Sequence, residues 1–217
     1  MGGYFGYENK FFRIAGKVVD GFYVSVLWLL FSIPIVTLHT ASVALYYTVH
    51  KSLHGDRGYI WQNFWGAFKS NFKQTTKIWL VMLCTLAFLF ADYRITYIAV
   101  EQGMPFRFLC YVFLFFMFFW AAWDIVLFAY SARFENSMKD TMKNAAVIAL
   151  LHLPWSLLMI VLLLAVLLAI YLVPPAVLLL PAGFVYVCEM ILERIFCKYM
   201  SPEDLKKEER LTESGRV

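Results

Sequence analysis

Residues 106–130 read FRFLCYVFLFFMFFWAAWDIVLFAY and decide the fold class of this chain. Arg107 and Asp124 are the only charged side chains in the stretch. A helix needs about 20 consecutive, mostly apolar residues to cross a bilayer. Inside lipid the backbone must satisfy its own hydrogen bonds, which a helix does locally. The stretch therefore predicts a transmembrane helix.

Three further apolar stretches, residues 78–99, 154–173 and 176–196, have a similar length. The whole chain has the composition of a membrane protein, since 62% of its residues are hydrophobic and 16% are charged, against roughly 45–50% and about 25% in soluble domains. We expect an all-α fold, a polytopic bundle of transmembrane helices. Residues 1–200 would form a single domain, and residues 201–217 a polar cytoplasmic tail.

The first apolar region, residues 18–49, is too long for one ordinary span. Pro34 interrupts it, and proline removes a helical hydrogen bond. Thr40 or Ser42 would be a suitable N-cap for a new helix. Two interpretations follow. Either one span is followed by a helix on the membrane surface, which gives five membrane helices, or the region is a tight hairpin of two crossings, which gives six.

The distribution of basic residues favours six membrane helices. Lys and Arg collect in cytoplasmic loops. With six helices and both termini in the cytoplasm, only Arg94 and Arg107 lie outside, near the connection at residues 101–105. With five helices, Lys10, Arg13 and Lys17 would also lie outside.

A pattern of one aromatic residue or Met every fourth position, followed by Lys, occurs twice, seventy residues apart. It suggests an internal repeat of residues 35–99 and 105–173, with chance similarity as the alternative. Each copy has the pattern of an amphipathic helix on the cytoplasmic surface, with its apolar row in the membrane interface and its lysines beside that row. The two apolar rows are Phe64, Phe68, Phe72 and Phe134, Met138, Met142, and the lysines are Lys69, Lys73, Lys139 and Lys143.

Acidic residues within apolar spans are candidates for function, because a charge in the membrane is costly. Glu189 is central in the last span and Asp124 lies in residues 106–130. Glu189 would bind a proton, a cation or a polar partner, or would simply be a hydrogen-bonded carboxyl inside the bundle. His50 and His54 have no carboxylate nearby in sequence that would complete a metal site, so we expect them at the membrane interface. No nucleotide-binding, acyl-transfer or metalloenzyme motif occurs.

Several stretches resemble the YesL-like bacterial membrane proteins, the family of domain of unknown function 624. They are residues 27–47 (LWLLFSIPIVTLHTASVALYY), 63–80 (NFWGAFKSNFKQTTKIWL), 132–154 (ARFENSMKDTMKNAAVIALLHLP) and 194–199 (RIFCKY). His39 stands where the family usually has Gly. The resemblance implies a multi-pass protein of the bacterial plasma membrane, of a family often associated with carbohydrate uptake by ABC-type importers.

These features together predict a non-catalytic membrane protein, an accessory subunit of a solute transport system whose solute is a carbohydrate. A small self-contained carrier or channel is the alternative. The partners expected are the lipid bilayer and either ABC-type importer membrane subunits or another copy of the chain. We expect no enzyme activity, no cofactor, no metal and no nucleic acid.

Overall fold

The structure is a computed structural model that describes residues 5–54 and 59–200. The predicted polar tail, residues 201–217, lies outside the described residues. Every regular element in the described part of the chain is helical, which confirms the all-α prediction. The elements are α1 (Phe5–Ser32), η1 (Ile35–Thr37), α2 (Leu38–Thr48), η2 (Val49–His54), α3 (Ile60–Glu101), α4 (Arg107–Arg133), α5 (Met138–Leu151), α6 (Leu153–Leu172), η3 (Pro174–Leu178) and α7 (Leu180–Phe196).

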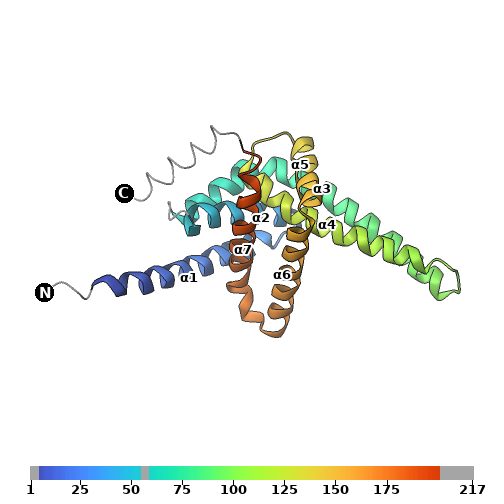
Figure 1. The fold of residues 1–217 in the computed structure, drawn as a ribbon, viewed down its shortest axis with the longest axis horizontal. Helices are drawn as coiled ribbons and strands as arrows, with labels where there is room; N and C mark the ends of the chain where they lie inside the picture. Colours follow the sequence, from blue (N-terminus) through green and yellow to red (C-terminus); the bar gives the residue numbers. More distant parts are fainter. Residues whose placement is uncertain (1–4, 55–58, 201–217) are drawn as a thin grey trace.

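The helices are arranged around the short helix α2. Figure 1 shows α1 leaving this centre on one side, the α3–α4 hairpin on the other, and the α6–α7 hairpin between them. The inner ends of α1, α3, α4 and α7 all pack against α2. The core of the molecule therefore lies where α1 and the two helical hairpins meet. The parts of these helices that lie far from α2 are free to contact lipid.

Four helices in the described residues are long and apolar enough to cross a membrane. They are Ile14–Ser32, Ile60–Glu101, Arg107–Arg133 and Leu153–Leu172. The predicted spans at residues 78–99, 106–130 and 154–173 thus correspond to helices α3, α4 and α6. Helix α7 has 17 residues, which at 1.5 Å per residue is about 25 Å. The predicted number of six membrane helices is not confirmed.

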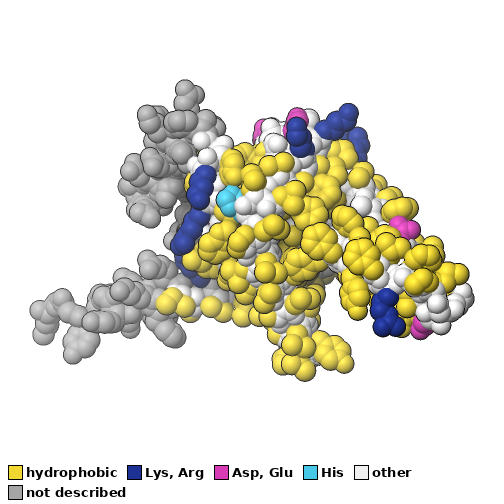
Figure 2. All heavy atoms as spheres, turned by 45° about the vertical axis from the view of Figure 1, so that its right-hand side comes forward, with side chains coloured by type: hydrophobic (Ala, Val, Ile, Leu, Met, Phe, Trp, Pro, Cys, Tyr) yellow, Lys and Arg dark blue, Asp and Glu magenta, His cyan; other side chains and the backbone are white. Residues whose placement is uncertain are grey.

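The exposed side chains of α3 and α4 are mostly apolar, as expected for helices that are surrounded by lipid. Phe88 on α3 and Phe108 and Phe115 on α4 are among the most exposed large side chains of the described residues. Figure 2 shows a broad hydrophobic surface on one face, with charged groups gathered along its upper edge and at the far end of the α3–α4 hairpin. A soluble protein rarely exposes so large an apolar area, so lipid is the fitting solvent for it.

The chain turns at Pro34, as the sequence predicts. Helix α1 ends at Ser32, and the backbone N–H of Thr37 donates to the Pro34 carbonyl at 2.9 Å. The Thr37 hydroxyl donates to the Phe31 carbonyl at 2.6 Å, which satisfies one of the last acceptors of α1. The N-cap of α2 is Thr37 and makes no side-chain capping bond, so neither Thr40 nor Ser42 is the cap that we expected.

Helix α2 is not a surface helix, and a second crossing at this place is not confirmed. Its 11 residues extend about 16 Å and are continued by the six π-helical residues of η2, whereas the hydrocarbon core is about 30 Å thick. Eight of its side chains are buried, namely His39, Thr40, Ala41, Val43, Ala44, Leu45, Tyr46 and Thr48. A surface helix would expose one face. Helix α2 is instead enclosed by the helices around it.

The predicted surface helix at Phe64–Phe72 is part of α3, which continues without a break from Ile60 to Glu101. Its apolar row does not lie in the membrane interface, since Phe64 is 0% and Phe68 7% exposed and both belong to the core. In the second copy, Phe134, Met138 and Met142 are partly buried against the same core. Phe64 and Phe68 therefore pack on protein, whereas Phe72 is 38% exposed. The second row packs beside α4, the main neighbour of α5, a contact that the sequence alone does not reveal.

Candidate functional site

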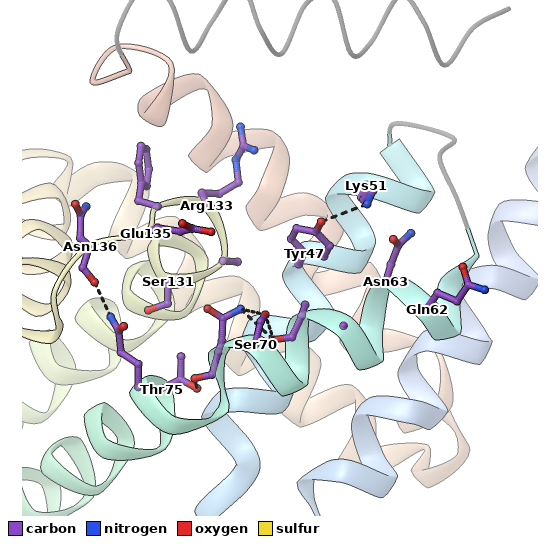
Figure 3. A pocket seen from close by; sticks show the side chains of 16 residues that line it. Tyr47, Lys51, Gln62, Asn63, Ser70, Thr75, Ser131, Arg133, Glu135 and Asn136 are labelled. Atoms are coloured by element: carbon purple, nitrogen blue, oxygen red, sulfur yellow. Dashed lines mark hydrogen bonds between the residues drawn. The ribbon is translucent and has the colours of Figure 1, made fainter.

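A cavity of about 780 Å³ opens between three elements. These are the end of α2 with η2, the first half of α3, and the end of α4 with the connection to α5 (Figure 3). Most lining residues carry an amide, a hydroxyl or a charge. They are Tyr47, Lys51, Gln62, Asn63, Gly66, Ala67, Ser70, Asn71, Gln74, Thr75, Ser131, Ala132, Arg133, Phe134, Glu135 and Asn136.

The walls of this cavity are held in place by side-chain hydrogen bonds. Gln74 Nε2 on α3 donates to the Asn136 carbonyl at 2.8 Å, which joins α3 to the α4–α5 connection. On the other side, Asn63 Nδ2 donates to Ser52 Oγ at 2.8 Å. Lys51 Nζ donates to the Tyr47 hydroxyl at 3.3 Å. The cavity is therefore built from polar groups whose positions are fixed by their own partners.

The four lysines predicted as candidates lie on both sides of the cavity. Lys69 and Lys73 are on the same turns of α3 as the lining residues Ser70 and Asn71, and Lys139 and Lys143 are on α5. All four side chains are exposed. The burial of Phe64 and Phe68 on the opposite side of α3 orients its lysines outward, because side chains three or four positions apart share one face of a helix. The four lysines do not line the cavity itself, but Lys69 and Lys73 are neighbours in sequence of residues that bound it.

A network of charged side chains lies behind the cavity wall. Arg133 lines the cavity, and its Nη2 donates to Glu193 Oε2 at 2.9 Å while its Nε lies 2.8 Å from Glu193 Oε1. The Tyr46 hydroxyl donates to Glu193 Oε1 at 3.0 Å. A two-pronged contact of this kind suits the planar guanidinium group. Helices α2, α4 and α7 are thus tied together by one carboxylate.

Glu189 is one turn before Glu193 on the same face of α7. It is 1% exposed, and its Oε1 lies 2.7 Å from His50 Nδ1. The interpretation of Glu189 as a carboxyl in the interior agrees with this position. The sequence offered His50 no carboxylate partner, but its side chain is only 24% exposed and contacts the buried Glu189 carboxylate.

Asp124 has a histidine partner of its own. His39 Nδ1 lies 3.1 Å from Asp124 Oδ1, and the His39 ring stacks on Trp79 with ring centres 5.7 Å apart. His39 is 2% exposed. The structure does not bring Asp124 together with Glu189 in one site, since each pairs with a different histidine. His39 joins α2 to α4 through this contact.

Sequence reasoning missed both histidine–carboxylate pairs. His50 and Glu189 are 139 residues apart, and His39 and Asp124 are 85 apart, so no local spacing indicates them. One signal was available, because Glu189 and Glu193 have the i, i+4 spacing that places two carboxylates on one helix face. Such a face inside an apolar helix requires partners from another helix.

The first part of the chain matches a known protein family. Residues 22–93 match the family described as "Protein of unknown function, DUF624". The resemblance found in the sequence is thereby confirmed for the last part of α1, for α2 and for most of α3. The match ends before α4, so Asp124, Arg133 and Glu189 lie beyond it. No curated protein and no solved structure matches this chain.

The contact between Arg133 and Glu193 leads to a prediction about stability. Arg133→Met leaves the Glu193 carboxylate without its cation in a site only 15% exposed. Removing one partner of a buried pair costs about 3–5 kcal/mol, and the partial exposure reduces this to about 2 kcal/mol. Unfolding of the purified protein in detergent should measure the loss.

The double variant Arg133→Met/Glu193→Gln should recover at least half of that stability, because it removes both charges. Arg94→Met, at the exposed far part of α3, is the matched control and should change little. Equal destabilisation of the single and double variants would show that the pair does not hold α4 and α7 together.

Proposed function

We propose that this protein is a non-catalytic accessory subunit of a solute transport system in the bacterial plasma membrane. The observation that carries the proposal is the polar cavity flanked by exposed lysines on α3 and α5. Family resemblance supports a carbohydrate as the solute of that system. The role of the surface would be to bind another subunit, because no set of nucleophile, acid and base accompanies the cavity in the described residues.

The chemistry of the surface favours an acidic partner. Lys69, Lys73, Lys139 and Lys143 are exposed cations around a cavity that offers amide and hydroxyl groups. Electrostatic complementarity speeds association and selects the partner. An acidic segment of an ABC-type importer membrane subunit fits this surface, with its carboxylates near the lysines and its backbone polar groups near Gln62 and Asn71. Self-association of the chain would need an acidic counterpart on a second copy.

The burial of Phe64 and Phe68 sharpens this proposal. If Phe64 and Phe68 lay in the membrane interface, the lysines beside them would contact lipid headgroups. Because both rings pack inside the protein, the orientation of the lysines depends on the core. The surface is therefore preformed, and a preformed surface loses less conformational entropy when it binds.

A carrier is the second candidate, and the two histidine–carboxylate pairs favour it. Ionisable groups inside membrane proteins often mark ion or proton pathways. The cavity, however, is lined from the inner ends of the helices, and no lining residue comes from the distal parts of α3 or α4 or from α6 or α7. We therefore rank the accessory role first.

The accessory role requires a defined orientation, with the cavity and both termini in the cytoplasm. In a cysteine-free variant, Gln102→Cys in the α3–α4 connection should react with a membrane-impermeant thiol reagent added to intact cells. Gln102 is preferable to its neighbour Gly103, whose φ of 89° a side chain would strain. Gly3→Cys should react only after the cells are opened. Labelling of Gly3→Cys in intact cells would overturn the orientation.

Binding of the proposed partner is tested by reversing the charge of two of the exposed lysines. Lys69→Glu/Lys139→Glu should reduce the amount of the importer membrane subunit that co-purifies in mild detergent by at least about tenfold, since two attractive contacts become repulsive. Abundance of the variant in the membrane should stay normal, because both side chains are exposed.

Arg94→Glu/Arg107→Glu is the matched control, with the same charge change at the far end of the α3–α4 hairpin. It should leave co-purification unchanged. Retention of the importer subunit by the lysine variant, or its absence from wild-type preparations, would contradict the accessory role.

A further inference from the structure

His50, Glu189 and Glu193 form a cluster that the proposed function does not use. Each offers one ligand atom, and these three atoms lie within 4.8 Å of one another. His50 is in η2, a six-residue π-helical segment that follows α2, and the two glutamates are one turn apart on α7. Two separate elements therefore direct an imidazole nitrogen and two carboxylates to one point.

The ligand types fit a divalent transition-metal ion. Zn²⁺ binds imidazole nitrogen and carboxylate oxygen, and three protein ligands leave a fourth position for water or another ligand. Hard ions such as Mg²⁺ and Ca²⁺ prefer oxygen ligands alone, so the histidine favours a first-row transition metal. His50 Nδ1 lies 2.7 Å from Glu189 Oε1 and 3.8 Å from Glu193 Oε1, so small shifts would place all three atoms around one ion.

The surroundings of Glu193 leave room for a metal. A carboxylate has about four lone-pair positions. Tyr46 and Arg133 Nε contact Oε1, and Arg133 Nη2 contacts Oε2, so the position that remains for a metal is on Oε2. These contacts also orient the carboxylate, in the way that hydrogen bonds from neighbouring groups orient metal ligands elsewhere.

Burial strengthens the argument. Glu189 is 1% exposed, and the side chains of His50 and Glu193 are 24% and 15% exposed. Arg133 already offsets the charge of Glu193, and a divalent cation would offset the remaining negative charge of the two neighbouring carboxylates. The partial exposure of His50 leaves a path for an ion to enter.

We propose that His50, Glu189 and Glu193 bind one divalent transition-metal ion, with Zn²⁺ as the representative. The ion takes the place of the hydrogen bond between His50 and Glu189. The His50 ring then carries its proton on Nε2 and binds the metal through Nδ1. Since His50 follows directly from α2 and the glutamates belong to α7, the ion would fix α7 against the centre of the fold.

The test uses the full-length protein, purified in detergent and stripped of metal with a chelator. Addition of Co²⁺ should give the visible absorption of a cobalt ion bound to protein ligands, saturating at one equivalent, and Zn²⁺ should abolish this absorption by displacement. Calorimetry with Zn²⁺ alone should give the same stoichiometry. Absence of one-equivalent binding by the wild-type protein would overturn the proposal whatever the variants do.

Substitution of single residues tests which side chains bind the ion. His50→Ala and Glu189→Gln should each weaken Zn²⁺ binding at least about tenfold, since even groups that only orient a metal ligand contribute that much. His152→Ala is the matched control, because His152 contacts Tyr199 away from the cluster. Binding that is unchanged in Glu189→Gln would overturn the proposal.

Thermal unfolding distinguishes a variant that has lost the metal site from one that folds poorly. Zn²⁺ should raise the melting temperature of the wild type and of His152→Ala, because a ligand stabilises the folded state that binds it. It should not raise that of Glu189→Gln, whose own unfolding transition shows whether it is folded. An equal rise in all three proteins would place the ion elsewhere and contradict the proposal. None of these results depends on whether the lysines bind a transport partner.

Discussion

The rest of the structure depends on the burial of α2, a short helix with polar side chains in an apolar molecule. A buried polar group is costly unless it is hydrogen-bonded. Helix α2 meets most of this requirement with side-chain hydrogen bonds to each of four surrounding helices. The contacts are Ser42 with Trp28 of α1, Thr40 with Thr75 of α3, His39 with Asp124 of α4 and Tyr46 with Glu193 of α7. Each contact fixes the position of one surrounding helix.

The two ends of α2 carry the features that matter for function. At its beginning, the turn after Pro34 is held by Trp79, whose Nε1 donates to the Ile35 carbonyl at 2.7 Å. At its end, Tyr47 and Lys51 line the cavity and His50 joins the charged cluster with α7. The proposed partner surface and the proposed metal site therefore share one support. A change that loosened α2 would affect both.

The sequence predicted the long apolar helices and the break at Pro34, because both follow from local composition. It did not predict the role of α2. Residues 38–48 are mostly apolar, but their composition does not show that other helices pack around them and bury them. The fate of Phe64 and Phe68 was missed for the same reason. An apolar row on a helix indicates that something apolar covers it, and it does not distinguish lipid from protein.

The sequence predicted the carboxylates of the candidate site but not their partners or the cavity. A carboxylate in an apolar span is visible in the sequence, so Glu189 and Asp124 were identified. Their partners were not, since His50 and His39 are far away along the chain. The cavity could not be predicted either, because its walls come from three separate elements that only the packing brings together. The lysines were correctly expected to be exposed, although the core and not the membrane orients them.

The most direct test of this account is a disulfide between α2 and α3. Thr40 Oγ1 and Thr75 Oγ1 lie 2.8 Å apart, so Thr40→Cys/Thr75→Cys in a cysteine-free variant should form an intramolecular disulfide under mild oxidation. Thr40→Cys/Thr85→Cys is the matched control, with the second cysteine ten positions further along α3. Mass spectrometry of the digested protein should find the bond between positions 40 and 75 and none between 40 and 85. A disulfide in neither variant, or in both to the same extent, would contradict the enclosed position of α2.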